Sequence, residues 1–297
     1  MAEHNSTTQS NVTPARAVVI TGASTGIGAA CARRLAQAGF HVFAGVRNAV
    51  DGVALQQQVT SQMTPLLLDV TDADQIAAAQ TTVTQLVGER GLVGLVNNAG
   101  IAVGGPLEFV PMSALRRQME INVYGALAVT QAFLPLLRLA GGRIINMSSI
   151  SGLAASPFLG PYAASKYALE ALSDALRLEV RPWGIAVVLV EPGNIATPIW
   201  QKGLAFADEL AAQLPTQAHT YYGPIFPFLR AMLARNRGTP AAVVAQVVEQ
   251  ALIVPRPRAR YVVGNDARLR IWIERLPTRW RDRLIASRLP QFGKTAK

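Results

Sequence analysis

The feature that most constrains the fold is an alternation, repeated from residue 17 onward, between short β-branched runs and longer runs rich in Ala and Leu. This is the pattern of βαβ units, in which each helix returns the chain so that successive strands pair in parallel. Strands are predicted at Ala17–Thr21, His41–Val46, Thr64–Leu68, Gly94–Asn97, Arg143–Met147, Ile185–Val190 and Arg260–Val263. Helices are predicted at Gly26–Gln37, Asp74–Gly88, Ser113–Leu137, Tyr162–Arg181 and Pro240–Ile253. The sequence therefore predicts an α/β, doubly wound domain with a seven-stranded parallel sheet and helices on both faces.

The length of the chain favours one large domain. Half of its 297 residues are apolar, which is enough for a sizeable core. We place this domain at residues 15–265, after a polar and disordered tail at residues 1–14 that does not resemble a signal peptide. The alternation breaks between residues 197 and 238, where four prolines occur among large apolar residues, so a substrate lid is predicted within residues 195–238. The alternative is that these apolar residues belong to the domain core.

The first predicted strand leads directly into a glycine-rich turn, Thr21-Gly22-Ala23-Ser24-Thr25-Gly26-Ile27-Gly28, and then into a helix. Glycines let such a turn tighten and let its backbone approach a pyrophosphate, whose charge the N–H groups at the helix start stabilise. The spacing differs from the G-x-G-x-x-G pattern. A tight strand-to-helix connection is the alternative interpretation. Because the turn follows the first strand, we favour a Rossmann-like dinucleotide site.

The end of the second strand indicates which dinucleotide binds. A carboxylate at this position favours NAD, whereas an arginine favours the 2′-phosphate of NADP. Arg47 follows the strand here and no carboxylate occupies the tip. A solvated loop arginine is the alternative. NADP(H) is therefore the predicted cofactor, with NAD(H) as the second choice.

Polar residues also follow the third and fourth strands. Asp69 ends the third, and Asn97-Asn98-Ala99-Gly100 ends the fourth. Ligands of open parallel sheets gather at the carboxyl ends of the strands, so both segments are expected along the dinucleotide. Asp and Asn also cap turns, and a structural role for Asn97 is at least as well supported as a ligand contact.

Tyr162 and Lys166 share one face of a predicted helix that begins near Pro161. A free tyrosine has a pKa near 10, and a nearby ammonium favours the phenolate, so this pair suits proton transfer at neutral pH. Ser149, after the fifth strand, is placed to donate a hydrogen bond to a substrate oxygen. A turn role for Ser149 is the alternative, and Ser148 and Ser151 are neighbours of the same type. By itself Tyr-x-x-x-Lys is more often a surface pair.

Taken in order, these motifs resemble the short-chain dehydrogenase/reductase family over roughly residues 17–197. The resemblance rests on Thr21-Gly-x-x-x-Gly-Ile-Gly28, Asn97-Asn-Ala-Gly100, Asn122, Ser149, Tyr162-x-x-x-Lys166 and Pro192-Gly193. The phrases around Arg90–Val96 and Ser165–Glu170 are similar to the branch that contains retinol and hydroxysteroid dehydrogenases.

The resemblance implies a mechanism and a set of catalytic residues. Tyr162 is expected to act as general acid in reduction or as base in oxidation, Lys166 to lower the pKa of Tyr162 and hold the nicotinamide ribose, and Ser149 to orient the carbonyl. Asn122 is expected to hold a water that links Lys166 to solvent. A buried amide that satisfies backbone groups is the structural alternative for Asn122, and both roles can coexist.

The resemblance also assigns cofactor contacts. Those expected at the phosphates, adenine, riboses and nicotinamide are Gly22, Ser24, Thr25, Gly26, Ile27, Gly28, Arg47, Asp69, Val70, Asn98, Ala99, Gly100, Tyr162, Lys166, Pro192, Gly193, Ile195 and Thr197. The single cysteine, Cys31, excludes an intramolecular disulfide and fits a reducing cytoplasm, and the three histidines are too far apart in sequence to predict a metal site.

The predicted pocket is mostly apolar, with Ile150, Leu153, Pro157 and Phe158 among its expected walls. It suits a lipophilic alcohol, ketone or aldehyde. The family resemblance also implies a homodimer or homotetramer. A non-catalytic NADP(H)-binding sensor or scaffold is the alternative function, but it would not need Ser149, Tyr162 and Lys166 together, so we favour the enzyme.

The positive charge of the chain is concentrated near its C-terminus. Residues 255–297 carry twelve Arg or Lys against three Asp or Glu. Residues 266–297 are read as a basic amphipathic helical extension. We favour packing of this extension on the body or on a second subunit, with contact to a membrane surface as the alternative. No recognition motif supports nucleic-acid binding.

Overall fold

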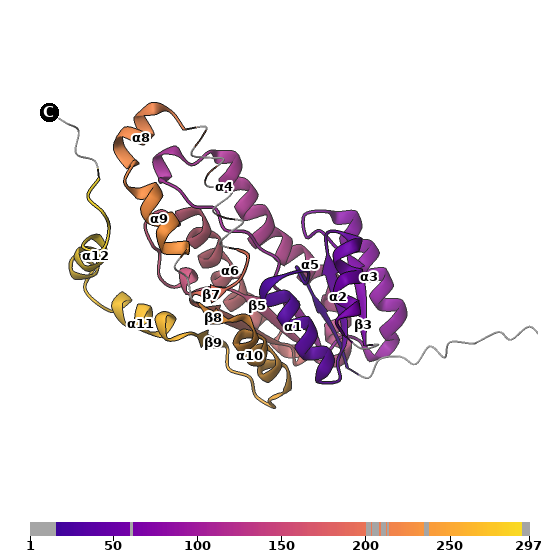
Figure 1. Ribbon diagram of the computed structural model, residues 1–297. Coiled ribbons are helices and arrows are strands. Elements are labelled where there is room, and N and C mark those ends of the chain that lie inside the picture. The colour runs from indigo at the N-terminus through magenta and orange to yellow at the C-terminus, as the bar shows by residue number, and fades with distance from the viewer. Residues whose placement is uncertain are drawn as a thin grey trace, which may run out of the picture.

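The computed structural model describes residues 16–59, 62–199, 203, 208, 212, 214–234 and 238–292. Its centre is a parallel sheet in the order β3-β2-β1-β4-β5-β6-β9. The strands are β1 (Ala17–Ile20), β2 (His41–Val46), β3 (Met63–Leu67), β4 (Gly94–Asn97), β5 (Arg143–Met147), β6 (Ala186–Pro192) and β9 (Arg260–Val263). The prediction of a doubly wound α/β fold with seven parallel strands is confirmed (Figure 1).

Helices cover both faces of the sheet. One face carries α1 (Gly26–Gln37), α2 (Ala49–Gln57) and α10 (Ala241–Ile253), and the other carries α3 (Ala73–Val87), α5 (Ala126–Ala140) and α6 (Gly160–Glu179). Side chains alternate along each strand, so Val18 and Ile20 of β1 face the first layer while Val19 faces the second. Two apolar cores, one on each side, therefore hold the sheet between them.

The predicted helix Ser113–Leu137 is three segments that follow one another. These are α4 (Met112–Met119), a π-helical stretch (Glu120–Gly125) and α5. A Cβ on Gly125 would lie 2.7 Å from Val70 Cγ2, so the absence of a side chain lets the helix approach the loop after β3. By length and mean hydropathy the stretch Met112–Ala140 qualifies as a membrane span, but Val129, Phe133 and Leu137 are buried in the core, and core helices pass the same test.

Two local features differ from the sequence prediction. Helix α2 is not predicted, because only Gly52 and Leu55 of its nine residues are buried and its apolar periodicity is correspondingly weak. Strand β3 begins and ends one residue earlier than predicted. It lies at the edge of the sheet, where Pro65 is tolerated.

The rest of the chain lies at the carboxyl edge and the periphery of the sheet. It comprises β7 (Ile195–Ala196), β8 (Thr239–Pro240), α8 (Thr216–Tyr222), α9 (Ile225–Ala234), α11 (Asn265–Glu274) and α12 (Thr278–Ala286). The first two form a small separate sheet. Figure 1 shows α11 and α12 at the outside of the molecule. The predicted tail, residues 1–14, lies outside the described residues, and the predicted lid is described only in part.

Candidate active site

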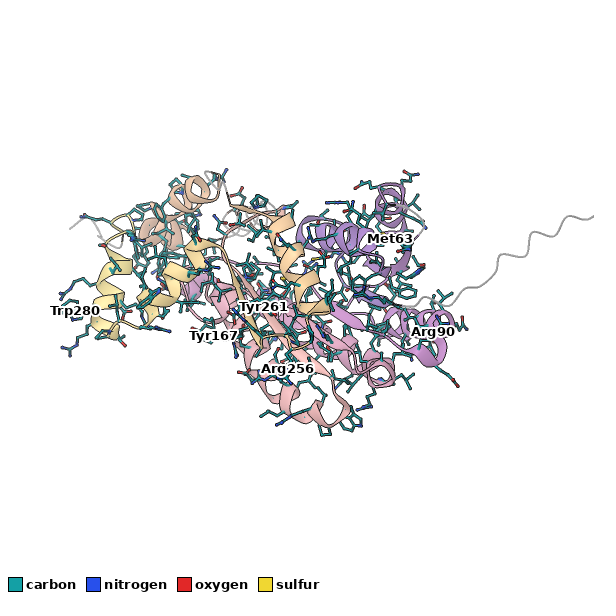
Figure 2. The ribbon with its side chains drawn as sticks, turned by 90° about the horizontal axis from the view of Figure 1, so that it is seen from below. Met63, Arg90, Tyr167, Arg256, Tyr261 and Trp280 are labelled. Atoms are coloured by element: carbon teal, nitrogen blue, oxygen red, sulfur yellow. The ribbon has the colours of Figure 1, made fainter. Side chains whose placement is uncertain are left out.

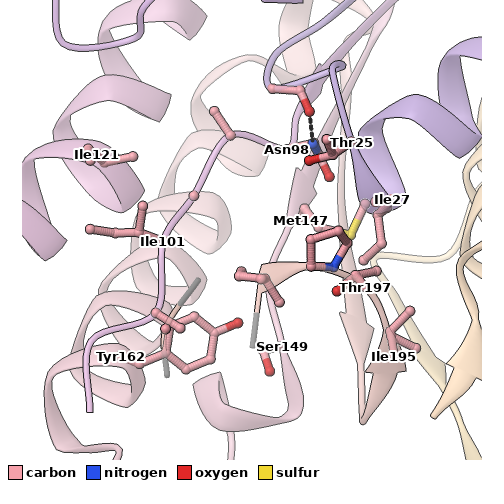
Figure 3. A pocket seen from close by; sticks show the side chains of 18 of the residues that line it. Thr25, Ile27, Asn98, Ile101, Ile121, Met147, Ser149, Tyr162, Ile195 and Thr197 are labelled. Carbon is pink, nitrogen blue, oxygen red and sulfur yellow. Dashed lines mark hydrogen bonds between the residues drawn. The ribbon is translucent and has the colours of Figure 1, made fainter. Parts of the chain in front are cut away.

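A cavity of about 370 Å³ lies at the carboxyl ends of the central strands. Of the predicted site residues, those that line it are Gly22, Ser24, Thr25, Gly26, Ile27, Arg47, Asp69, Val70, Asn98, Ala99, Gly100, Ser149, Tyr162, Lys166, Pro192, Gly193, Ile195 and Thr197. Gly28 and Asn122 lie behind this lining. In Figure 3 Tyr162 and Ser149 lie together in one part of the pocket, and Thr25, Ile27 and Asn98 in another. Segments more than 150 residues apart in sequence thus line one cavity.

The glycine-rich turn after β1 is shaped by its glycines and held by Asn98. Gly22 and Gly26 have φ values of 63° and 59°, a backbone region that favours glycine. The side-chain amide of Asn98 donates to the carbonyls of Thr21 and Gly22, each at 3.0 Å. A Cβ on Gly26 would lie 3.3 Å from the Cβ of Thr197, so the turn and the loop after β6 face each other closely. This open backbone cradle at a helix start fits a pyrophosphate.

Gly28 acts through packing. A Cβ at this position would lie 2.2 Å from the carbonyl oxygen of Gly22 and 2.5 Å from the amide nitrogen of Asn98. The helix therefore begins against the turn and leaves no room for a side chain. The structure places Gly28 behind the cradle, which gives it the helix-packing role of a third glycine in such a turn.

Arg47 and Asp69 lie at the end of the cavity formed by β2 and β3. Arg47 directly follows β2, is exposed and lines the cavity. The carboxylate of Asp69 accepts hydrogen bonds from the backbone N–H and the hydroxyl of Thr71, at 3.0 and 2.8 Å. Asp69 thus shapes its own turn as well as lining the cavity. The guanidinium of Arg47 is the cationic group of this end of the cavity.

Tyr162, Ser149 and Lys166 form a buried group beside β5. Tyr162 and Lys166 are 6% and 5% exposed and lie one turn apart on α6. The hydroxyl of Tyr162 forms a hydrogen bond with Ser149, whose oxygen also accepts from the N–H of Ser151 at 3.1 Å. The ammonium of Lys166 donates to the carbonyl of Met147 at 2.7 Å and lies 5.7 Å from the Tyr162 ring centre. Among the three neighbouring serines, Ser149 is the one that contacts Tyr162.

Burial shifts the pKa values of both Tyr162 and Lys166. It raises the pKa of Tyr162, and the hydrogen bond from Ser149 opposes that shift. It also lowers the pKa of Lys166 to about 8, against the opposing charge of Glu170. The Lys166 ammonium donates to Met147, and the lowering of the pKa of Tyr162 by Lys166 stays a prediction. Because burial raises its pKa, Tyr162 keeps its proton at neutral pH.

Asn122 holds the loop that follows β4. Its side chain accepts from the N–H of Ile101 at 2.9 Å and donates to the carbonyl of Ile101 at 3.0 Å and to Ser165 at 3.1 Å. Gln118, which the sequence analysis does not single out, supports the same loop through Val103 and Ile101. A buried amide on the helix face that follows a strand-end loop is the signal that would have identified it.

Asn97 has a structural role. Its amide donates to Thr130 and to Asn146, each at 2.8 Å, and the side chain of Asn146 in turn donates to Ser173. These polar side chains are buried between β4, β5 and the helices that cover them. Asn97 does not line the cavity, whereas its neighbour Asn98 does.

The loop after β6 is held by the start of α11. The carboxylate of Asp266 accepts from the N–H of Asn194 at 2.7 Å, and a Cβ on Gly193 would lie 2.4 Å from the same carboxylate. Since Gly193 lines the cavity, Asp266 supports the site from outside it. The sequence assigns Asp266 only to the C-terminal extension, because no local pattern connects it to residue 194.

The remaining walls are mainly apolar, but they differ from those predicted. Ile150, Leu153, Pro157 and Phe158 lie outside the lining. The additional described lining residues are Leu68, Ile101, Ala102, Val103, Arg117, Ile121, Met147, Ser148, Pro198, Ile199 and Gly203. The 3₁₀ turn Ile150–Gly152 packs against α6. The apolar wall therefore comes from the loop after β4 and from the helix that faces it.

Comparisons with known proteins agree with this geometry. Residues 16–207 match the family described as short chain dehydrogenase. The chain is 37% identical to the NADPH-dependent 3-dehydrocapnine reductase of Ornithobacterium rhinotracheale, covering 84% of this chain and 88% of that protein. It is 36% identical to retinol dehydrogenase 5 of Mus musculus, with coverages of 92% and 89%.

A solved structure shows the same fold. The short chain dehydrogenase of Burkholderia cenocepacia in complex with NADP superimposes with a TM-score of 0.68 at 25% identity, over 93% of this chain and 98% of that chain. The resemblance to the retinol and hydroxysteroid dehydrogenase branch is also confirmed. The chain belongs to the short-chain dehydrogenase family, whose members bind nicotinamide cofactors and transfer hydride as oxidoreductases.

Proposed function

We propose that the protein is an NADP(H)-dependent oxidoreductase that interconverts a lipophilic alcohol and its ketone or aldehyde, with Tyr162 as the proton-transferring residue. The observation that carries the proposal is the buried contact of Tyr162 with Ser149, one turn from Lys166, in a cavity that also holds the glycine cradle. A cofactor site and an acid–base group that share one cavity are what hydride transfer to a carbonyl requires.

The residues present fit a nicotinamide dinucleotide. The cradle of Gly22 and Gly26 would hold the pyrophosphate, and Arg47 would pair with a 2′-phosphate. The names of two similar proteins support the choice of NADP, since one is NADPH-dependent and the other was solved with NADP. When bound, the cofactor supplies or accepts the hydride.

The side chains of the site supply the proton and the orientation. In reduction, Tyr162 donates its phenolic proton to the carbonyl oxygen of the substrate, and Ser149 donates a hydrogen bond to the same oxygen as charge develops there. Because burial raises the pKa of Tyr162, the protonated donor form prevails at neutral pH. Lys166 keeps one ammonium hydrogen bond to Met147, and its other protons would hold the ribose hydroxyls.

The apolar wall supports a lipophilic substrate. Ile101, Val103, Ile121 and Ile199 line the cavity beside the polar group of Tyr162 and Ser149. Such a pocket recovers free energy by burying alkyl or ring carbon and fixes orientation through few polar contacts. The similarity to a retinol dehydrogenase agrees with this substrate class. We place the protein in the cytoplasm, as a homodimer or homotetramer.

The test is a comparison of Tyr162→Phe with Tyr167→Phe, a change to the exposed neighbour on the same helix. With NADPH and a panel of lipophilic ketones and aldehydes, Tyr162→Phe is expected to lower kcat by about 10²–10⁴-fold. NADPH affinity should stay within about threefold, and Tyr167→Phe should behave as the wild type. Unchanged turnover in Tyr162→Phe would refute the assigned role. Wild-type binding of NADPH with no turnover across the panel would instead favour a sensor.

A further inference from the structure

We propose that α11 and α12 form a docking surface for an anionic phospholipid membrane. The surface, called the docking face below, consists of Arg268, Leu269, Trp272, Arg275, Leu276, Arg279, Trp280 and Arg283. All eight residues are exposed. Arg268, Leu269 and Trp272 lie on α11, Arg279, Trp280 and Arg283 lie on α12, and Arg275 and Leu276 lie in the short connection between the helices. On each helix the last of the three residues follows the other two at intervals of three and four. Residues with this spacing share one side of a helix. This binding is independent of the function proposed above.

Helix α11 has a side that packs on the body, and both helices have an exposed side. On α11 the inner side is carried by Ala267, Ile271 and Ile273, which are buried or half-buried, and Arg270 donates to the carbonyl of Ala155 on the body. On α12 no residue is buried, and Arg281, Leu284 and Ile285 are half-buried. Packing on the body is thus seen for the inner side of α11. The docking face is the exposed side.

The two tryptophans are the main apolar feature of the docking face. Trp272 and Trp280 are 67% and 70% exposed. An aromatic ring buries more apolar area than most side chains when it is covered, so these two exposed rings leave a large apolar area in contact with water. Figure 2 shows Trp280 at the outer edge of the molecule, directed away from the body. The guanidinium of Arg275 lies 5.0 Å from the Trp272 ring centre. Tryptophan backed by arginine is the combination that helices lying at a membrane interface present.

The charge of the docking face is positive and unpaired. None of the three acidic residues of the two helices pairs with an arginine of the docking face. Glu274 pairs with Arg270 and Arg281, Asp282 pairs with Arg281, and Asp266 accepts from the N–H of Asn194. Across the described residues, the four arginines of the docking face make no ion pair. Unpaired guanidinium groups attract the phosphates of anionic lipids. Apolar side chains alternate with them, which favours a bilayer interface over a nucleic-acid backbone.

The chain beyond α12 returns to the body of the molecule. Phe292 packs against Phe158 and Tyr222, each at a ring-centre distance of 5.8 Å. The carbonyl of Phe158 accepts from the N–H of Gly105, two residues after Val103 of the apolar wall.

The experiment is co-sedimentation of the full chain with vesicles of phosphatidylcholine alone or mixed with phosphatidylglycerol. We expect binding to the mixed vesicles, weakened by added salt, with a blue shift of tryptophan fluorescence. The double variant Trp272→Ser/Trp280→Ser and the double variant Arg275→Gln/Arg279→Gln should each lower partitioning by about tenfold or more.

Arg181 and Trp183 provide a matched control. Both are exposed, Trp183 at 49%, and Trp183 also lies under a guanidinium, that of Arg138 at 4.5 Å. Arg181→Gln/Trp183→Ser should bind vesicles as the wild type does. All variants should keep the wild-type melting temperature and NADPH affinity, because the changed residues are exposed and lie outside the cavity lining.

Three results would overturn the proposal. The first is equal sedimentation with and without anionic lipid that neither double variant changes. The second is wild-type protein that ignores vesicles but dissociates into smaller species when Trp272 and Trp280 are replaced, as measured by light scattering, since the docking face would then be a contact between copies. The third is saturable binding of nucleic acid, lost in the arginine variant, without vesicle binding.

Discussion

Arg260 on β9 lies 3.1 Å from a carboxylate oxygen of Glu191 on β6, and Glu191 is completely buried. The same guanidinium also pairs with Glu170 at 3.0 Å and with Asp174 at 2.7 Å, both on α6. Three carboxylates thus share one arginine beside the helix that carries Tyr162 and Lys166. Two of the carboxylates, Glu170 and Glu191, are buried, so they cannot both ionise without cost.

Glu191 is predicted to make the stability of the protein fall as the pH rises. Burial and the charge of Glu170 raise the pKa of Glu191 from 4.5 to about 7. The folded state holds the Glu191 proton up to a higher pH than the unfolded chain does. The resulting stabilisation is fully present below pH 4.5 and is lost as the pH rises through 7. Glu191→Gln should therefore raise the melting temperature at pH 8 and flatten its decline between pH 5 and 8. The difference in free energy of unfolding should be at most about 3 kcal/mol.

Asp174→Asn is the control for this prediction. The hydrogen bond from Arg260 lowers the pKa of Asp174, so its charged form stabilises the fold and the amide should destabilise it at pH 7. Opposite signs for the two variants in thermal unfolding would agree with the shared guanidinium. A loss of stability at pH 8 in both would mean that Glu191 is charged in the folded state.

Arg47→Ala should change the choice of cofactor. Loss of a charge-assisted hydrogen bond to a 2′-phosphate weakens NADPH binding by about 10- to 100-fold, whereas NADH, which lacks that phosphate, should bind nearly unchanged. Fluorescence titration of both cofactors measures the effect. Arg33→Ala removes a nearby arginine that pairs with Gln58 outside the cavity, and should alter neither affinity. Equal weakening for NADPH and NADH in Arg47→Ala would contradict the assignment.

Gly28→Ala should weaken cofactor binding although its backbone conformation is ordinary. The new Cβ would lie 2.2 Å from the Gly22 carbonyl, so the helix start or the turn must move. We expect at least a tenfold loss of NADPH affinity. Gly39→Ala is the comparison, because Gly39 has φ of 84° with nothing within 4 Å, and its cost is conformational only, about 1–2 kcal/mol of stability. Normal NADPH affinity in Gly28→Ala would show that the turn tolerates displacement.

Asn122→Ala should lower kcat more than Gln118→Ala does. Both side chains hold the loop at Ile101, so each variant should cost about 1–3 kcal/mol of stability by leaving buried backbone groups unpaired. Asn122 alone also contacts Ser165, whose hydroxyl donates to the carbonyl of Tyr162 at 2.7 Å. Steady-state kinetics across pH, with thermal unfolding on the same samples, separates the effects. Equal losses of kcat would restrict Asn122 to supporting the loop.

Much of the site was predictable from local patterns. The glycine turn, the strand-end segments and the Tyr162–Lys166 pair each occupy a short stretch whose turn chemistry or helical spacing places its side chains. Because the carboxyl ends of parallel strands meet at one edge of a sheet, these stretches converge once the strand pattern is known. For Gly28 the local pattern was not sufficient. Its spacing indicates a turn residue, but only the position of Asn98 shows that it acts through packing.

By itself the sequence determined the fold class, the seven strands and which residues lie at the carboxyl edge, because periods of two and 3.6 residues and glycine turns act over a few neighbours. The tertiary structure alone decided that Arg260 serves three carboxylates, that Asp266 supports the loop at Asn194, and that burial raises the pKa of Tyr162. These partners are distant in sequence. Their charges and exposure depend on which strands and helices become neighbours, a property of the packed chain as a whole.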